Sequence, residues 1–141
     1  MERVVVTKGP EETVRLGEEL AGELREGDVV ALVGELGTGK TTLVKGIAQG
    51  LFVREAVISP SFILARTYQG RVPLHHLDAY RVTDPEELQE VGLTELLPPE
   101  EGITVVEWAD RVAELIPPGS LWIHLEHLDE GRRKLTLHRQ I

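Results

Sequence analysis

The sequence predicts an α/β fold in which a largely parallel sheet is flanked by helices and extended by antiparallel strands. Two observations support this fold class. Short apolar runs that are typical of strands alternate with segments of helical periodicity. One of these runs, Val29–Val33, is followed by a glycine-rich loop and then by a helical segment. Because the 141 residues contain no internal repeat and no low-complexity linker, residues 1–141 are expected to form a single domain.

The glycine-rich loop, Gly34–Thr41, fits the phosphate-binding pattern G-x-x-x-x-G-K-[ST]. Gly37 and Gly39 allow backbone N–H groups to approach an anion, and the Lys40 ammonium can reach the β- and γ-phosphates of a nucleotide. The hydroxyl of Thr41 is an oxygen ligand of the kind that Mg²⁺ prefers. A glycine-rich turn that binds nothing is the alternative interpretation, but the strand–loop–helix context favours nucleotide binding. The fold is therefore expected to be P-loop NTPase-like.

The first half of the chain is expected to carry two strands and two helices. Residues 3–6 form a short apolar strand, and Pro10 suits the first position of the helix that follows. Leucines recur at every fourth position, so this helix should continue to about Arg25 and end at Gly27. The helix after the glycine-rich loop should end at Gly50.

The middle of the chain predicts a β-hairpin inserted between two helical segments. Residues 62–68 and 72–77 can form two strands around a turn at Gln69-Gly70. A new helix should then begin with Asp84 as its cap and Pro85 at its first position.

The pattern of the C-terminal part predicts one apolar strand followed by two strands with alternating apolar and polar residues. A short helical turn at 93–97 precedes the apolar strand 103–106, and a helix over 110–116 ends before two prolines. Residues 121–125 alternate between apolar and polar side chains, as expected of a strand with one exposed face. Residues 135–137 continue this alternation in a last, antiparallel strand.

Composition and charge exclude several classes of protein. The net charge is −9, from 24 acidic and 15 basic residues, so the chain is a poor primary ligand for tRNA or DNA despite the local cluster Arg132–Lys134. The lack of cysteine excludes disulfides and thiolate metal sites. The sequence has no apolar run of about 18 residues and no secretory signal. We therefore expect no membrane span and a cytoplasmic location. An N-K-x-D guanine-binding signature is also missing.

Several polar residues outside the glycine-rich loop are candidates for the same site. Such a loop needs an acidic partner for Mg²⁺ at the end of a neighbouring strand, and either Glu107 or Asp78 can supply it. Ser59–Phe62 is either a proline turn or a switch loop whose hydroxyls sense the γ-phosphate. His75 and His76 are adjacent, so on a strand they point in opposite directions and do not form a metal site together.

Four motifs occur in order along the chain: Gly34–Thr42, Ser59–Phe62, His76–Leu88 and Val106–Trp108. Together they resemble the TsaE (YjeE) family of small bacterial P-loop ATPases over nearly the whole chain. The resemblance implies a role in forming N6-threonylcarbamoyladenosine (t6A) at position 37 of tRNAs that read ANN codons, with the TsaD and TsaB proteins. It implies a weak Mg²⁺-dependent ATPase activated by these partners, which itself neither forms nor transfers the threonylcarbamoyl adenylate.

The resemblance also implies a role for each matching position. Asp78 and Lys40 would be catalytic, with Asp78 orienting water or acting as a base. Thr41 and Glu107 would hold Mg²⁺. The residues implied to bind ATP are Gly37, Thr38, Gly39, Lys40, Thr41, Thr42, Trp108 and Arg132.

Three further segments take roles from the same resemblance. Ser59 and Ser61 would be the switch hydroxyls, and Ser61 stands where the family usually has threonine, so the hydroxyl is kept without the methyl group. The segment near Pro10 and Thr13 would border adenine. The pair Gly131-Arg132 would contact ATP near the C-terminus.

Two other functions are compatible with the glycine-rich loop. The first is a small-molecule P-loop kinase, which needs an acceptor pocket and an arginine-bearing lid. Arg66, Arg71 and Arg81 are scattered, and no basic lid segment is visible. The second is a regulatory module that binds nucleotide without turnover. The isolated acidic domain should bind tRNA poorly. The resemblance implies a TsaD–TsaB complex as the partner.

Overall fold

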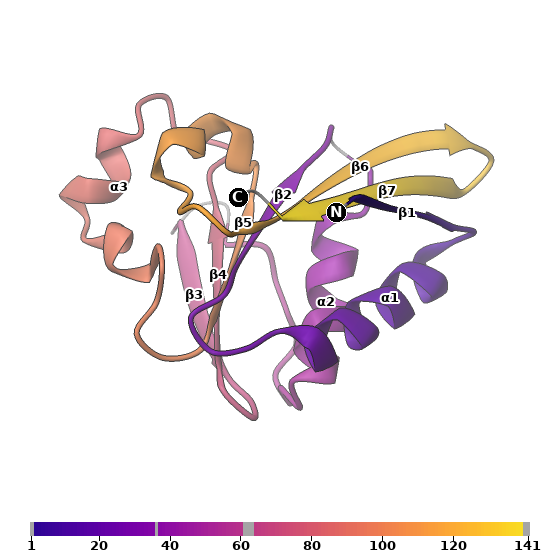
Figure 1. Cartoon of the computed structure of the whole chain (residues 1–141), viewed down its shortest axis with the longest axis horizontal. Helices are drawn as coiled ribbons and strands as arrows, with labels where there is room; N and C mark the ends of the chain where they lie inside the picture. Colours follow the sequence, from indigo (N-terminus) through magenta and orange to yellow (C-terminus); the bar gives the residue numbers. More distant parts are fainter. Residues whose placement is uncertain (1, 36, 61–63, 140–141) are drawn as a thin grey trace.

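The computed structural model describes residues 2–35, 37–60 and 64–139. Seven strands form one sheet in the order β1-β7-β6-β2-β5-β4-β3 (Figure 1). The strands are β1 (Glu2–Thr7), β2 (Val29–Val33), β3 (Ala65–Gln69), β4 (Pro73–Asp78), β5 (Ile103–Glu107), β6 (Leu121–Asp129) and β7 (Arg132–Arg139). The α-helices are α1 (Pro10–Glu23), α2 (Lys40–Gly50) and α3 (Glu86–Glu90), and two 3₁₀ segments are η1 (Leu93–Leu96) and η2 (Ala109–Leu115).

The sheet is mixed, with a parallel centre and antiparallel edges. Strands β6, β2, β5 and β4 run parallel to one another. At one edge β3 pairs antiparallel with β4, and at the other β7 and then β1 add antiparallel strands. The expected P-loop NTPase-like α/β fold, with its hairpin and its antiparallel C-terminal strand, is therefore confirmed. Strand β6 is the junction, since it is parallel to β2 and antiparallel to β7.

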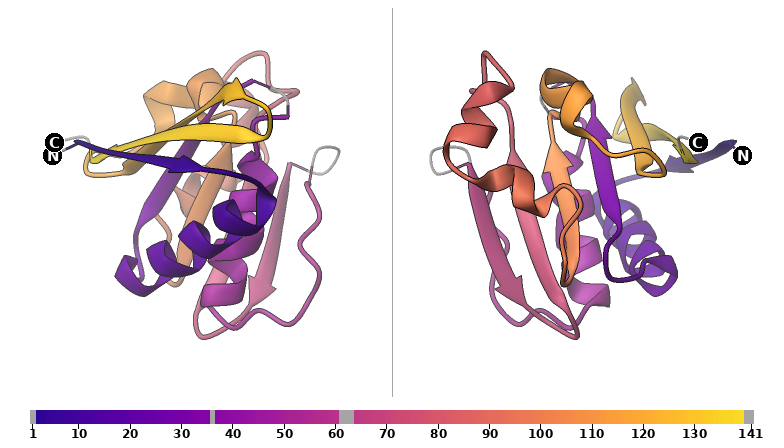
Figure 2. Two further views of the ribbon diagram at one scale, coloured as in Figure 1. Left: turned by 90° about the vertical axis from the view of Figure 1, so that its right-hand side faces the viewer. Right: turned by 60° about the vertical axis from the view of Figure 1, so that its left-hand side comes forward.

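Helices cover both faces of the sheet (Figures 1 and 2). Helices α1 and α2 pack on one face, where Val30 and Leu32 of β2 point, and α3 and η2 pack on the other, where Val29 and Ala31 point. The alternation of these β2 side chains explains why the strand is apolar throughout, because both of its faces are buried. Among the described residues, no helix is both long and apolar enough to cross a membrane.

The predicted end of the first helix is about two residues too late. Helix α1 ends at Glu23 rather than at about Arg25, well before Gly27, and Leu24 is already extended, with φ −84° and ψ 147°. Leu24 is buried in the core, so the chain must leave the helix there to place this side chain. The turn that follows is closed by the Asp28 carboxylate, which accepts a hydrogen bond from the Arg25 N–H at 2.8 Å.

Other boundaries differ less from the prediction. Strand β3 begins at Ala65, and residues 61–63 lie outside the described chain. The segments expected as short helices near 93–97 and 110–116 are both 3₁₀ rather than α. The helix start differs by one residue, since Pro85 rather than Asp84 is the N-cap of α3. The Asp84 carboxylate still accepts a hydrogen bond from the Glu86 N–H at 3.0 Å.

The carboxyl ends of the parallel strands meet at one edge of the sheet. The glycine-rich loop leaves β2 there, and the last residues of β4 and β5, Asp78 and Glu107, are register partners. Strand β6 continues beyond its last pairing with β2, at His124, and carries the β6–β7 hairpin past the loop. In open α/β sheets this edge is where ligands bind.

Candidate nucleotide-binding site

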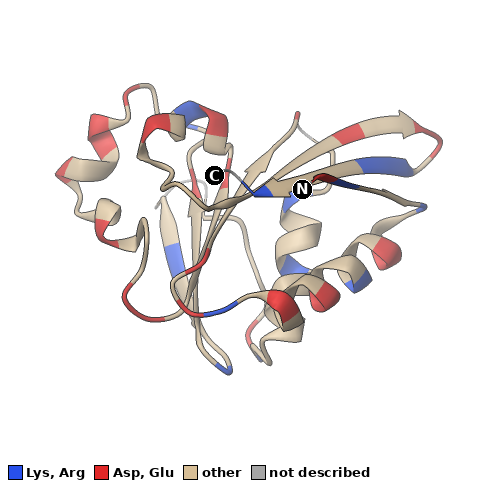
Figure 3. Cartoon of the chain, viewed as in Figure 1, with Lys and Arg blue, Asp and Glu red and all other residues tan. Residues whose placement is uncertain are grey.

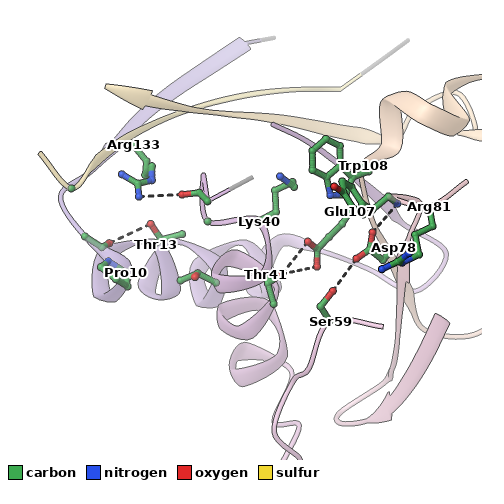
Figure 4. Close-up of a pocket in the computed structure, with 16 residues that line it drawn as sticks. Pro10, Thr13, Lys40, Thr41, Ser59, Asp78, Arg81, Glu107, Trp108 and Arg133 are labelled. Carbon is green, nitrogen blue, oxygen red and sulfur yellow. Dashed lines mark hydrogen bonds between the residues drawn. The ribbon is translucent and has the colours of Figure 1, made fainter. Parts of the chain in front are cut away.

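A cavity of about 490 Å³ opens at this edge of the sheet, at the N-terminus of α2 (Figure 4). Its size lies within the range of small-molecule sites. Its lining comes from six regions of the chain: the start of α1, the glycine-rich loop with α2, the segment before β3, the end of β4, the end of β5, and the start of β7. The lining residues are Gly9, Pro10, Thr13, Gly37, Gly39, Lys40, Thr41, Thr42, Ser59, Asp78, Tyr80, Arg81, Glu107, Trp108, Gly131 and Arg133.

The glycine-rich loop needs glycine at two positions for different reasons. Gly39 precedes α2 with φ +100°, a conformation that side chains disfavour. Gly34 lies against β6, where an added Cβ would come within 2.6 Å of the Leu125 carbonyl oxygen. The loop is therefore anchored on β6 and turns so that the N-terminus of α2, with its unpaired N–H groups and positive dipole end, faces the cavity.

Lys40 extends from the first turn of α2 beside the cavity. Its ammonium donates hydrogen bonds to the carbonyl oxygens of Gly34 and Glu35, the latter at 2.8 Å. Burial lowers the pKa of Lys40, while the carboxylates of Glu107 and Asp78 act in the opposite direction. The ammonium thus lies within its own loop, as the cation that a bound phosphate would meet.

Trp108 forms one wall of the cavity next to Lys40. It follows β5 with φ +59°, which is an outlier for a bulky residue, and its ring lies 4.2 Å from the Lys40 Nζ and 5.0 Å from the ring of Tyr80. The Arg111 guanidinium lies 5.3 Å from the Trp108 ring. Strained residues cluster at functional sites, and here the strain directs an aromatic surface toward the cavity.

Thr41 and Glu107 are in direct contact at the base of the cavity. The Thr41 hydroxyl lies 3.0 Å from each carboxylate oxygen of Glu107, although the two residues are 66 positions apart. Glu107 is buried, and its Oε2 also lies 2.6 Å from Nε2 of His76. This pair gives the site two hard oxygen ligands of the kind that Mg²⁺ takes.

Asp78 lies beside this pair but has other partners. Its Oδ2 accepts a hydrogen bond from the Ser59 hydroxyl at 2.8 Å, and its Oδ1 accepts one from the Tyr80 N–H at 2.9 Å. The structure therefore separates the two acidic candidates: Glu107 is next to the Thr41 hydroxyl at the end of the glycine-rich loop, and Asp78 is next to the segment that the sequence suggested as a switch.

Most residues that the sequence singled out come together around this cavity. Thr38 is buried directly behind it, and its hydroxyl donates to the Glu35 carbonyl oxygen at 2.8 Å. Ser61, the second switch hydroxyl, lies outside the described residues. The expected site residues found in the lining are Gly37, Gly39, Lys40, Thr41, Thr42, Ser59, Asp78, Glu107 and Trp108.

Arg132 is an expected site residue that the structure places outside the cavity lining. Its guanidinium forms an exposed ion pair with Asp129 at 2.6 Å, whereas the neighbouring Arg133 lines the cavity and donates to the Gly37 carbonyl oxygen at 3.2 Å. The alternation of side chains along β7 explains this difference. Arg133 lies on the same face of the strand as Leu135 and Leu137, which face the core beside α1. That signal was present in the sequence.

The resemblance placed the segment near Pro10 and Thr13 next to the nucleotide, and both residues line the cavity. Thr13 is held by the Thr7 hydroxyl at 2.8 Å, which ties α1 to β1. Sequence reasoning missed Tyr80 and Arg81 as lining residues, although they follow Asp78 directly. It also missed the buried contact between β4 and β5 that involves His76, since residue spacing carries no information about which strands are neighbours.

Comparison with known proteins agrees with this geometry. The family model described as "Threonylcarbamoyl adenosine biosynthesis protein TsaE" matches residues 7–135. The chain is 39% identical over 132 residues to a tRNA threonylcarbamoyladenosine biosynthesis protein TsaE of Treponema pallidum, covering 94% of this chain and 97% of that protein. The Bacillus subtilis protein of the same name is 38% identical over 131 residues, covering 92% and 81% of the two chains.

A solved structure supports the same assignment. The crystal structure of Bacillus subtilis YdiB superimposes with a TM-score of 0.86 and 32% sequence identity, covering all of this chain and 87% of that one. The chain therefore belongs to the TsaE family of threonylcarbamoyl adenosine biosynthesis proteins.

Proposed function

We propose that the protein binds ATP with Mg²⁺ in this cavity and hydrolyses it, and that the hydrolysis serves the formation of t6A at position 37 of tRNAs reading ANN codons. The observation that carries the proposal is the contact between Thr41 and Glu107 beneath a phosphate-binding loop. It joins a threonine at the start of α2 to an acid at the end of a neighbouring strand, which is how P-loop NTPases hold Mg²⁺.

The donor atoms of this pair fit a magnesium ion. Mg²⁺ binds oxygen at about 2.0–2.1 Å in octahedral geometry, so adjacent ligands lie about 2.9 Å apart. The Thr41 hydroxyl and the Glu107 carboxylate oxygens are separated by 3.0 Å. Bound there, the ion would neutralise charge on the β- and γ-phosphates. The chain's own contribution is to hold these oxygens, to cradle the phosphates with backbone N–H groups and to present the Lys40 ammonium.

Asp78 is the residue that we assign to the attacking water. It is buried, it lies at the cavity wall, and two donors fix the orientation of its carboxylate. One of those donors is Ser59, so a movement of the Ser59 segment would change how Asp78 is held. This link supports the proposal that the segment acts as a switch.

Substitution of the two acids should produce different defects. Glu107→Gln removes the charge of a direct metal ligand. The Mg²⁺ concentration needed for half-maximal ATP binding should therefore rise at least about tenfold, because loss of a residue that only hydrogen-bonds to a metal ligand already lowers metal affinity by about tenfold. Asp78→Asn should preserve ATP binding and lower the hydrolysis rate by about 10²–10⁴, the contribution of a general base. Calorimetric titration and phosphate release measure these effects, and the opposite pattern would reverse the assignment.

The two neighbouring arginines of β7 form a matched pair for a binding test. Arg133→Ala should weaken ATP binding by up to about tenfold, because a charged hydrogen-bond donor at the cavity rim is lost. Arg132→Ala should change affinity by less than about twofold, because its guanidinium faces Asp129 outside the cavity. Equal losses for both variants would support the role for Arg132 that the family resemblance implies.

We further propose that the protein acts in the cytoplasm on a complex of TsaD and TsaB homologues. Acidic positions are spread over most elements, while β7 has a short basic stretch at its start (Figure 3). With a net charge of −9, direct tight binding of tRNA is unfavourable, which favours a protein partner. ATP hydrolysis by the protein alone should be weak and should increase when the partner complex is added.

The partner proposal is tested by equilibrium binding of the TsaD–TsaB complex in the presence of ATP, of ADP and of no nucleotide. ATP should tighten binding, while tRNA should bind the isolated protein poorly at physiological salt. Identical affinities in all three nucleotide states would contradict the switch. ADP formation that depends on a small-molecule acceptor, with the phosphoryl group found on that acceptor and not as free phosphate, would favour a kinase.

A further inference from the structure

His76 is a buried histidine that neither phosphate recognition nor hydrolysis, as described above, uses. It lies on β4 two residues before Asp78, so its side chain points to the same face of the sheet, toward α2. Its exposed fraction is 0%, and its Nε2 lies 2.6 Å from Oε2 of Glu107, whose side chain is 4% exposed. A buried carboxylate needs partners of this kind to remain ionised and in place.

The hydrogen-bond partners indicate which nitrogen of His76 carries the proton. An ionised carboxylate only accepts hydrogen bonds, so Nε2 must be the donor. Nδ1 has no hydrogen-bond partner among the described residues and is shielded from solvent. The contacts therefore assign a proton to Nε2, the nitrogen that faces Glu107.

The two oxygens of Glu107 are consequently not equivalent. Oε2 accepts from His76 and also lies 3.0 Å from the Thr41 hydroxyl, whereas the one hydrogen bond of Oε1 within the described part of the chain is that with Thr41, at 3.0 Å. The His76 hydrogen bond fixes the rotation of the carboxylate. It leaves Oε1 as the oxygen with the greater free capacity, next to the hydroxyl that completes the metal-binding pair.

We propose that His76 is a positioning residue for the Mg²⁺ site: its Nε2–H holds Glu107 so that Oε1 stays beside the Thr41 hydroxyl as a metal ligand. This inference rests on the proposed function, because it requires that Glu107 binds Mg²⁺. Partners that orient a metal ligand in this way typically contribute 10–100-fold in metal affinity. A purely structural role for the buried pair would instead affect folding stability and leave the metal affinity unchanged.

Two amide substitutions separate these roles. In His76→Gln the side-chain nitrogen can reach the position of Nε2, whereas the shorter amide of His76→Asn ends near the position of Nδ1 and cannot reach Glu107. His75→Asn is the matched control, because His75 points to the opposite face and contacts Thr67 and the Glu101 carbonyl oxygen. The probe is AMP-PNP, a nonhydrolysable analogue of ATP, titrated at a series of Mg²⁺ concentrations and in EDTA.

His76→Asn should raise the Mg²⁺ concentration for half-maximal AMP-PNP binding by about 10–100-fold. His76→Gln and His75→Asn should stay within about threefold of the unsubstituted protein, and AMP-PNP affinity in EDTA should be the same for all. An unchanged Mg²⁺ requirement in folded His76→Asn would overturn the inference. By contrast, an unsubstituted protein that binds AMP-PNP equally well with Mg²⁺ and EDTA would contradict the proposed metal site itself.

A measurement on the unsubstituted protein covers the case in which His76→Asn does not fold. Nitrogen-15 NMR distinguishes the two imidazole tautomers and assigns each of the five histidines. His76 should be protonated at Nε2, and its nitrogen shifts should change when Mg²⁺ is added to the AMP-PNP complex. An Nε2 without a proton, or shifts that do not respond to Mg²⁺, would exclude the positioning role.

Discussion

Replacing Lys40 by alanine is expected to weaken ATP binding by about 10–150-fold, corresponding to about 1.5–3 kcal/mol for a hydrogen bond to a charged group. The ammonium lies at the N-terminus of α2, within a loop whose carbonyl oxygens and the Trp108 ring hold it in place. The substitution removes the charge that we propose contacts the β- and γ-phosphates. Titration of ATP in the presence of Mg²⁺ measures the loss, and hydrolysis should fall with it.

Lys45→Ala provides the matched control for this substitution. Lys45 lies on the same helix, carries the same charge and is exposed to solvent away from the cavity. Its removal should leave ATP affinity within about twofold, since exposed charges at a distance are screened by salt. If Lys40→Ala bound and hydrolysed ATP as the unsubstituted protein does, the glycine-rich loop would not be a nucleotide site.

Gly46→Ala should destabilise the protein by about 1–3 kcal/mol, even though alanine favours helices. Helices α1 and α2 approach so closely that an added Cβ at Gly46 would lie 2.9 Å from both Cα and the carbonyl carbon of Val14. Backbone atoms cannot move aside as a side chain can, so α1 would have to shift. Thermal unfolding should show a melting temperature lower by several degrees.

Gly22→Ala, in the same pair of helices, is expected to change stability in the opposite direction. Gly22 lies near the end of α1, and no atom lies within 4 Å of a Cβ added there. Because alanine loses less conformational entropy on folding, this variant should gain about 0.5–1 kcal/mol. A Gly46→Ala variant as stable as Gly22→Ala would mean that the two helices do not pack at the distance seen in the structure.

The parts of the fold that could be predicted are those encoded by residues close together in the sequence. The apolar strand Val29–Val33, the loop and the helix α2 were all expected, because composition and spacing specify local conformation. The end of α1 was not predicted correctly. Leu24 is buried in the core and leaves the helix before the glycine that marks a typical stop. Tertiary packing overrides local propensity at such positions.

The candidate site also has residues that the local sequence predicts and residues that only tertiary packing selects. Lys40 and Thr41 follow from the motif alone, because its spacing positions them at a helix N-terminus. Arg133 could have been chosen over Arg132 from the alternation of β7, which is again a local pattern. The choice between Asp78 and Glu107 as the metal ligand could not be made from the sequence. Both residues end buried strands, so both satisfy the requirement for an acid at a strand end.

By itself, the sequence determined that a glycine-rich loop joins a buried strand to a helix, and that two acidic residues end other strands. Only the tertiary structure decided that Glu107 contacts Thr41 across 66 positions and that His76 supports it from β4. The physical reason is that strand neighbours are chosen by the burial of both sheet faces and by register, which are properties of the whole sheet. Residues that are distant in the chain become partners only once that sheet has formed.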